Sequence, residues 1–395
     1  MRAVGVICEY NPFHNGHAYH LKKARELSSA DYVICVMSGS VTQRGTFARH
    51  DKWTRAQMAL QGGADLVLEL PVRFAVSSAQ EFASGGIGLL DRLGVVSHLS
   101  FGCEGEALPL LSAAQEALRS ETPEFTAALR EGLDQGMSYP RARAQAAAKT
   151  CSVEGIETAL SLPNAALALE YLAALPEGIA PIPVLREGSG YHDASLSALP
   201  SATAVRRALT EDRLDAAKDA VPCPELLAAS EARGDVHEEG ALSQALLYCL
   251  RTMPDEQLSQ IAGMDEGLHH RFIAAAHRCT SRRRLIEAVK TKRYTWARLS
   301  RLCSCALLGI TRDFAGQNNV PTYARILGLR RDAAPLLREI KQRSSIPLIT
   351  KAADYDQNDP LYALDLRAQD LWSLGCTAKE LRTAGRDLTT PPVII

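Results

Sequence analysis

Short apolar runs alternate with helix-like segments through the first hundred residues, and this alternation limits the possible fold more than any other feature. The apolar runs are AVGVIC (3–8), DYVICVMSG (31–39), DLVLELP (65–71) and HLSFGCE (98–104). The segments between them are GHAYHLKKARELS (16–28), KWTRAQMALQGGA (52–64) and AQEFASGGIGLLDRLG (79–94). Buried strands separated by helices are typical of a parallel sheet, so we expect an α/β fold.

Three of the expected strands end in loops that carry polar residues. In open parallel sheets, ligands bind beyond the carboxyl ends of the strands. We therefore expect the loops at 9–17, 38–45 and 102–106 to converge on one crevice.

The remainder of the chain has a different sequence pattern. Residues 107–175 are mainly helical in pattern, GIAPIPVLRE (178–187) is interpreted as a strand, and SATAVRRALTE (201–211) as a helix. After about residue 215 long helical segments dominate. The 395 residues are enough for two cores. We predict a sheet-bearing domain at 1–215 and a mainly helical domain at 216–395.

Composition predicts an ordinary globular protein, with 46% hydrophobic and 23% charged residues. No apolar run reaches the roughly 18 residues of a membrane span, and the first residues do not form a signal peptide. The ten cysteines are scattered without a CxxC pair, which favours reduced thiols. We expect a cytoplasmic protein with no membrane contact.

Charge is segregated although the net charge is only −1. Residues 210–266 hold 13 acidic and 4 basic residues, whereas residues 269–301 hold 10 basic residues and the single acid Glu287. A basic stretch of this density is typical of a polyanion-binding face. A solvated helix surface paired with the acidic stretch is the alternative.

The phrase HNGH places His14, His17 and, three residues on, His20 directly after the first expected strand. A metal site is one interpretation. In a helix, however, His20 points about 240° away from His14, and no Cys or carboxylate spacing supplies a third ligand. Satisfied core histidines are a second alternative, although three imidazoles beside a strand end are difficult to bury with partners.

A phosphate site fits the position of HNGH better. The loop leaves a strand and enters a helix, whose first N–H groups and dipole favour an anion. Gly16 allows close approach of a nucleotide because it has no Cβ. His14 and His17 are then expected to donate hydrogen bonds to phosphate oxygens.

Two motifs together resemble a known superfamily. HNGH is similar to the HxGH signature of the nucleotidylyltransferases, whose Rossmann-like parallel sheet is shared with class I aminoacyl-tRNA synthetases. SATAVR, with Ser201, Thr203 and Arg206, is similar to that superfamily's second signature, Ser-x-Thr-x-x-Arg. Two hydroxyls and a guanidinium at a helix start suit pyrophosphate. A simple N-cap by Ser201 is the alternative.

Longer phrases resemble the bacterial tRNA(Met) cytidine acetate ligases. They are GVICEYNPFHNGHAYHL, VMSGSVTQRG, KWTRAQMALQGGADLVLELP, FGCE, SLPNAALALEYL, KTKRYTWARLSR, YARILG and PLITK. Three positions depart from the family: Ser40-Val41 replaces Asn-Phe, and Cys103 replaces a serine. With Ser40, the 38–45 loop lacks an amide that the family has there.

The resemblance implies a two-step reaction. Acetate and ATP form acetyl-AMP and pyrophosphate, and the N4 amine of the wobble cytidine (C34) of elongator tRNA(Met) then takes the acetyl group. His14, His17 and Arg206 are the implied catalytic residues, and Mg²⁺ is expected to bridge the phosphates. The implied ATP-binding residues are Ile7, Cys8, Glu9, Tyr10, Asn11, Pro12, Phe13, His14, Asn15, Gly16, His17, Ala18, Tyr19, His20, Gly102, Asn164, Arg186, Glu187, Ser201 and Thr203.

Several of these residues also have structural explanations. Asn164 follows Pro163 and is suited to capping a helix, Arg186 to a surface ion pair, and Glu9 to a solvated loop. Tyr294 and Trp296 are interleaved with the basic stretch, where base stacking is possible, although a core position is favoured for Trp296. The basic residues expected to bind tRNA are Arg282, Arg283, Arg284, Lys290, Lys292, Arg293, Arg298 and Arg301.

Two other functions remain compatible with the motifs. An adenylyltransferase for a small phosphorylated metabolite explains both signatures but leaves the long basic second half without a role. A nucleotide-sensing RNA-binding protein predicts bound ATP that is never turned over. The sequence shows no requirement for a protein partner.

Overall fold

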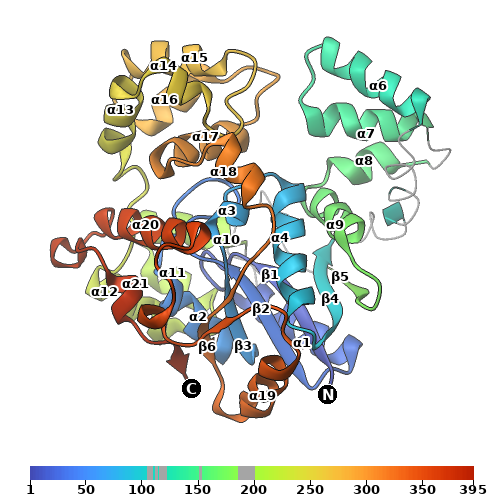
Figure 1. The fold of residues 1–395 in the computed structure, drawn as a ribbon, viewed down its shortest axis with the longest axis vertical. Helices are drawn as coiled ribbons and strands as arrows, with labels where there is room; N and C mark the ends of the chain where they lie inside the picture. Colours follow the sequence, from blue (N-terminus) through green and yellow to red (C-terminus); the bar gives the residue numbers. More distant parts are fainter. Residues whose placement is uncertain (105–109, 112–113, 115–121, 151–153, 186–200) are drawn as a thin grey trace.

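A single sheet organises the molecule (Figure 1). The computed structural model describes residues 1–104, 110–111, 114, 122–150, 154–185 and 201–395. In the described part of the chain the sheet has eight strands in the order β5-β4-β1-β2-β3-β6-β7, and β8 also pairs with β6. The strands are β1 (Ala3–Cys8), β2 (Tyr32–Ser38), β3 (Leu66–Leu70), β4 (Val96–Cys103), β5 (Ala180–Leu185), β6 (Ala324–Leu329), β7 (Leu348–Ile349) and β8 (Val393–Ile394).

Strand β1 lies inside the sheet, as its uninterrupted apolar sequence predicts. It pairs in parallel with β2 and β4, and Val4 aligns with Val33 and His98. Its side chains alternate between two apolar clusters, because successive residues of a strand face opposite sides. Ala3 and Ile7 belong to one cluster, and Val6 to the other. The expected strands and the parallel α/β arrangement are confirmed.

Helices cover both faces of this sheet. The cluster that contains Val6 is closed by α1, α2, α10, α11 and α12. The cluster that contains Ile7 is closed mainly by α3, α4, α9, α19 and α20. Their bounds are α1 (Asn15–Ser28), α2 (Lys52–Gln61), α3 (Val72–Ala75), α4 (Ala79–Arg92), α9 (Pro163–Ala174), α10 (Ala202–Thr210), α11 (Leu214–Asp219), α12 (Pro224–Arg233), α19 (Ala334–Arg343) and α20 (Pro360–Leu374).

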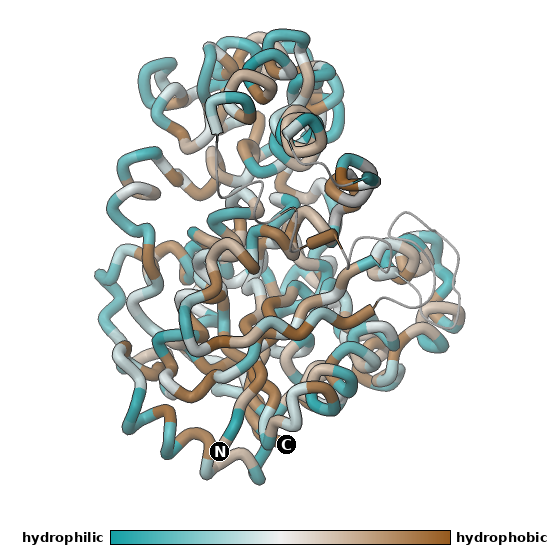
Figure 2. Tube along the Cα trace, turned by 90° about the vertical axis from the view of Figure 1, so that its right-hand side faces the viewer, coloured by the Kyte–Doolittle hydropathy of each residue, from teal (hydrophilic) through white to brown (hydrophobic). Residues whose placement is uncertain are grey.

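Two groups of helices rise beyond the sheet on opposite sides in Figure 1. One group has its own apolar cluster, and the other packs as a short helical stack. The first comprises α13 (Ser243–Thr252), α14 (Asp255–Ser259), α15 (Leu268–Ala276), α16 (Arg282–Val289), α17 (Trp296–Leu308) and α18 (Arg312–Gln317). The second comprises α6 (Pro123–Asp134), α7 (Tyr139–Thr150) and α8 (Ile156–Ser161). Hydrophobic residues concentrate along the central strands in Figure 2.

The chain returns to the sheet after the helical region, which the sequence analysis did not anticipate. Residues 216–395 are mainly helical, but β6 pairs antiparallel with β3, and β7 and β8 extend the sheet from β6. The short helix α21 (Arg386–Thr389) precedes β8. The two halves around residue 215 therefore share one sheet. Strand β6 carries little local signal for this place, because it pairs with a strand more than 250 residues away, and β7 and β8 in turn pair with β6.

A buried ion network ties the returning segment to the sheet. Lys52 donates to Glu69 at 2.7 Å and to Asp387 at 2.9 Å, and Arg325 lies 2.6 Å from Asp387. All four side chains are nearly or fully buried. Two cations and two carboxylates balance, which is the condition for burying charge without a large penalty.

Candidate active site

The HNGH phrase forms the turn from β1 into α1. His14 is the N-cap: its Nδ1 accepts a hydrogen bond from the Gly16 N–H at 3.1 Å. The His17 Nδ1 in turn accepts from the His14 N–H at 3.2 Å, which completes a capping box. A neutral imidazole that accepts at Nδ1 carries its proton at Nε2. The helix start therefore orients both rings as Nε2–H donors.

The two rings lie together, and His20 does not join them. The His14 and His17 ring centroids are 3.6 Å apart at an interplanar angle of 27°, with Tyr10 packed 4.7 Å from His17. His14 is only 3% exposed, so this end of the pair is enclosed. The His20 Nε2 instead pairs with the Ser100 hydroxyl at 3.0 Å. The three imidazoles thus do not converge as metal ligands.

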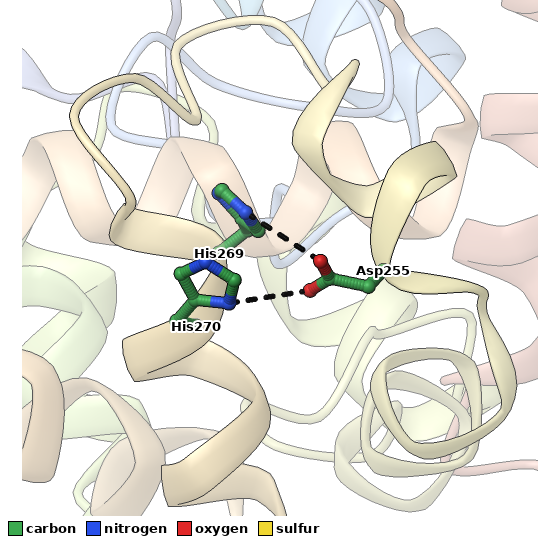
Figure 3. A group of neighbouring side chains, drawn as sticks. All are labelled: Asp255, His269 and His270. Atoms are coloured by element: carbon green, nitrogen blue, oxygen red, sulfur yellow. Dashed lines mark ion pairs between the residues drawn. The ribbon is translucent and has the colours of Figure 1, made fainter.

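Within the described ranges, the group of side chains that could hold a metal is elsewhere, between α14 and α15. Asp255 lies 3.9 Å from the His269 Nε2 and 3.4 Å from the His270 Nδ1 (Figure 3). Asp255 and His270 are largely exposed. These contacts explain the cluster as surface ion pairs, so it adds nothing to the HNGH site.

The second signature lies against the first. Ser201 is the N-cap of α10, and its Oγ accepts from the Ala204 N–H at 3.1 Å. Arg206, one turn further on, donates to the Thr203 hydroxyl at 3.2 Å and to the main-chain carbonyl of Asn11. The N-cap alternative for Ser201 is therefore true, but Arg206 also brings α10 to the histidine loop. Residues 195 positions apart in sequence are thus in contact.

A buried arginine that the sequence analysis missed holds the loops around this site. Arg55 of α2 is 0% exposed. Its guanidinium donates to the carbonyls of Glu9 at 2.8 Å, Ser38 at 2.9 Å and His50 at 3.0 Å, and also to Gly39. Burial lowers the pKa of Arg55 to about 10. Helix α2 is buried along almost its whole length, so the only sequence signal for Arg55 was a charge inside a helix that packs on all sides.

The loop between β2 and α2 also contacts the histidine loop directly. The Gln43 N–H donates to the Glu9 carboxylate at 2.5 Å, and the Arg49 N–H donates to the Asn11 side chain at 2.9 Å. The expected convergence of the first two loops is therefore confirmed. Glu9 is not a freely solvated acid, because its carboxylate anchors the neighbouring loop.

The base of this loop is fixed by an ion pair to α12. The Arg49 guanidinium donates to Glu231 at 2.7 and 2.8 Å, and the His50 Nε2 lies 2.9 Å from the same carboxylate. Burial alone would raise the pKa of Glu231, but the hydrogen bonds and charges of His50 and Arg49 outweigh it and lower the pKa to about 2.

The departures from the family pattern lie in the same loop. Ser40 is buried and its hydroxyl donates to the Gln369 side chain of α20 at 2.7 Å. Val41 is fully buried in the helical cluster. Ser40 is thus bound to Gln369 of α20, which lies 329 residues later in the chain.

The end of β4 and the first turn of α9 carry two further predicted residues. Gly102 lies in β4, and Asn164 lies in the first turn of α9, where its amide donates to Glu104. Leu162 is the N-cap of α9, so Asn164 does not cap that helix. Arg186 and Glu187 lie outside the described residues.

The predicted RNA-binding residues separate into two sets. Arg283 and Arg284 are 82% and 75% exposed on α16, where both pair with Glu287, and Lys290 and Lys292 are also exposed. Arg293, Arg298 and Arg301 line a cleft between the two groups of helices.

Two residues of this stretch differ from expectation. Arg282 points inward and donates to the carbonyls of Gly45 and Ser300, so it holds the loop instead of facing solvent. Trp296 is 41% exposed, whereas a core position was favoured; that expectation is wrong. Trp296 is the first residue of α17.

A parallel sheet whose first strand enters an HxGH helix start, with a Ser-x-Thr-x-x-Arg helix start bound across it, defines a HIGH-type nucleotidyl transferase. The family model described as HIGH Nucleotidyl Transferase matches residues 1–387.

Comparison with individual proteins narrows this class. The chain is 37% identical to the tRNA(Met) cytidine acetate ligase of Caldanaerobacter subterraneus subsp. tengcongensis over 95% of both chains. It is 38% identical to that of Thermoanaerobacter sp. over 99% of both. A crystal structure of Thermotoga maritima TmcAL bound with alpha-thio ATP superposes with a TM-score of 0.90 at 32% identity, covering both chains fully. The chain therefore belongs to the tRNA(Met) cytidine acetate ligase family.

Proposed function

We propose that this protein is an ATP-dependent acetate ligase that acetylates the wobble cytidine (C34) of elongator tRNA(Met) to N4-acetylcytidine. An acetate oxygen attacks the α-phosphorus of ATP, the bond to the bridging oxygen breaks, and pyrophosphate leaves. The cytidine N4 then attacks the acetyl carbonyl of acetyl-AMP, AMP leaves, and N4 loses one proton. Membership of the ligase family over nearly the full chain is the observation that carries this proposal.

The need for two steps follows from the reactants. Acetate is a poor acyl donor because its leaving group would be oxide, and the cytosine amine is a weak nucleophile because its lone pair is delocalised into the ring. A mixed anhydride with AMP supplies a good leaving group. The protein's task is then to position the reactants and stabilise charge.

We assign the α-phosphate to the HNGH turn. Two oriented Nε2–H donors on His14 and His17, at the positive end of α1, suit the charge that develops as pyrophosphate departs. The backbone of Ile7 through Asn11 lines the nucleotide in this proposal. Gly102 and Asn164 from β4 and α9, with Arg186 and Glu187, complete the ATP site.

We assign the departing phosphates to α10. Ser201 and Thr203 stand at its first turn and Arg206 one turn further on, and Arg206 bridges to the histidine loop. Mg²⁺ belongs to this proposal as a companion of the nucleotide; Glu9, the carboxylate closest to the histidines in sequence, already accepts from the Gln43 N–H. Such an ion keeps most of its water and needs few protein ligands.

Acetate, elongator tRNA(Met) and a cytoplasmic location belong to the same proposal. Among the described helices, none is long and apolar enough to cross a bilayer. We propose that tRNA contacts the exposed basic residues Arg283, Arg284, Lys290 and Lys292 together with Arg293, Arg298 and Arg301. Arg282 is left out of this set, because its guanidinium is bound to main-chain carbonyls.

Exchange of labelled pyrophosphate into ATP, with and without acetate, tests the first step. Acetate-dependent exchange supports the ligase, and exchange that needs a phosphorylated metabolite supports a small-molecule adenylyltransferase. Absence of exchange under every condition would contradict both and favour a nucleotide sensor. Mass analysis of N4-acetylcytidine in treated tRNA(Met) tests the second step.

A further inference from the structure

A cleft of about 670 Å³ lies between the two groups of helices. One wall comes from α7 and α9, the other from α17 and the 262–265 turn, and the floor from residues 76–81 after α3. Figure 1 shows the two groups on either side of this space. The volume is in the range of sites that bind a nucleotide-sized ligand.

Two connections join this cleft to the adenylation site. Gln43 lines the cleft, while its N–H donates to Glu9 of the histidine loop at 2.5 Å. Helix α9 carries Asn164 at its start and contributes Glu170 to the cleft wall. A ligand in the cleft therefore lies one loop away from the proposed ATP site.

The cleft has an excess of positive charge. Its lining contains five arginines (Arg73, Arg143, Arg293, Arg298 and Arg301) and three carboxylates (Glu81, Glu170 and Asp265). Most of these arginines are already balanced. Arg73 pairs with Glu81 at 2.7 Å, Arg143 pairs with Glu170, and Arg298 lies 3.9 Å from Asp265.

Arg301 differs from these arginines because it has no ion pair with any carboxylate in the described ranges. Its guanidinium donates one hydrogen bond, at 3.3 Å, to the Gln43 carbonyl. Burial lowers the pKa of Arg301, and the like charge of Arg298 acts in the same direction. An anion bound beside Arg301 would relieve both effects. Guanidinium is also the side chain best matched to two phosphate oxygens.

We propose that this cleft is an RNA-binding site in which Arg301 anchors a backbone phosphate and Arg298 supports it. The phosphate lies beside the acceptor nucleotide, so the cleft leads that nucleotide toward the acetyl-adenylate. This inference rests on the proposed function. It assigns the phosphate anchor to the cleft and not to the exposed surface formed by Arg283 and Arg284. The ligand class is a single-stranded RNA segment, such as an anticodon loop.

The test is binding of a fluorescent anticodon stem-loop with a cytidine at the wobble position, measured by anisotropy at two salt concentrations. Arg301→Ala is compared with Arg301→Lys and with the matched control Arg338→Ala, an exposed arginine of α19 outside the cleft. We expect Arg301→Ala to raise Kd about 10-fold and to reduce the salt slope by about one. Arg301→Lys should recover part of the loss, and Arg338→Ala should stay within about 2-fold of the wild type.

Arg298→Ala provides a second variant in case Arg301→Ala fails to fold, and it should weaken binding in the same direction. An unchanged Kd in both the Arg301→Ala and Arg298→Ala variants would overturn the inference. It would also be overturned if the Arg283→Ala/Arg284→Ala double variant lost binding while the cleft variants kept it. Failure of the wild type to bind the stem-loop would also overturn it. Pyrophosphate exchange is measured in parallel. If the wild type shows no acetate-dependent exchange, the proposed function is contradicted. If exchange is intact but the cleft variants bind RNA as the wild type does, only the assignment of the cleft as an RNA site is contradicted.

Discussion

Replacing His14 separates the capping role that the structure shows for this ring from the phosphate role that we propose for it. His14 caps α1 through Nδ1, and we propose that it binds the α-phosphate through Nε2. An asparagine in its place can still accept from the Gly16 N–H, because Asn is among the best N-cap residues. It cannot reproduce the second donor. His14→Asn should therefore keep the cap and lose the phosphate contact, and His14→Ala should lose both.

The expected magnitudes differ between stability and catalysis. Loss of the cap costs about 1 kcal/mol, and loss of the stacked contact with His17, 3.6 Å between centroids, costs about 1 kcal/mol more. His14→Ala should thus lower the free energy of unfolding by about 2 kcal/mol and His14→Asn by about 1 kcal/mol. Acetate-dependent exchange should fall about 10²- to 10³-fold in both variants, as for removal of one oxyanion donor.

Urea unfolding and exchange kinetics, measured on the same samples at saturating ATP, decide between these explanations. If exchange recovers in His14→Asn in step with its stability, the ring acts only as a helix cap and the phosphate role is wrong. His17→Asn is the matched comparison on the same helix turn. We expect a comparable loss of exchange there, because its ring is oriented in the same way.

Three further predictions concern the framework around the site. The pKa of Glu231 is about 2 in the folded protein and about 4.3 in the unfolded chain. Its ion pair therefore stabilises the fold above pH 4.3, by about 1–2 kcal/mol after solvent screening. That stabilisation is lost as the pH falls toward 2. Between pH 5 and pH 3 the wild type should therefore lose more stability than Glu231→Gln in urea unfolding; parallel losses would contradict this. Lys52→Met should lower stability by about 3–5 kcal/mol, because the buried carboxylates of Glu69 and Asp387 would then share the single charge of Arg325. A urea midpoint equal to that of the wild type would refute that reasoning. Gly39→Ala should cost about 1–3 kcal/mol in thermal or urea unfolding, since its Cβ would lie 2.0 Å from the Glu69 Oε1; no change would show that the carboxylate moves freely.

Local patterns were sufficient for the elements that build the first half of the sheet. The apolar runs at 3–8 and 65–71 lie within two residues of their strand bounds, because buried parallel strands need continuous apolar sequence. The HNGH phrase was also readable, since a helix start after a strand places donors at a sheet edge regardless of the rest of the chain.

The roles of buried polar residues were not readable in this way. Arg55 and Glu69 lie in helix and strand segments, where a charge usually indicates a solvent-facing position. Each is buried because its partners come from elsewhere: main-chain carbonyls for Arg55, and Lys52 and Arg325 for Glu69. Arg282 shows the converse, since it belongs to a basic run yet its guanidinium turns toward the Gly45 carbonyl.

The amino-acid sequence alone specified the alternating strands and helices, the HNGH and SATAVR signatures and the family, because these depend on residues close together along the chain. Tertiary structure was needed to show that β6 pairs with β3, that Arg206 reaches the Asn11 carbonyl, and that Arg301 shares a cleft with α9. Such contacts join segments separated by more than a hundred residues. No local pattern encodes them, since each depends on how the entire chain packs.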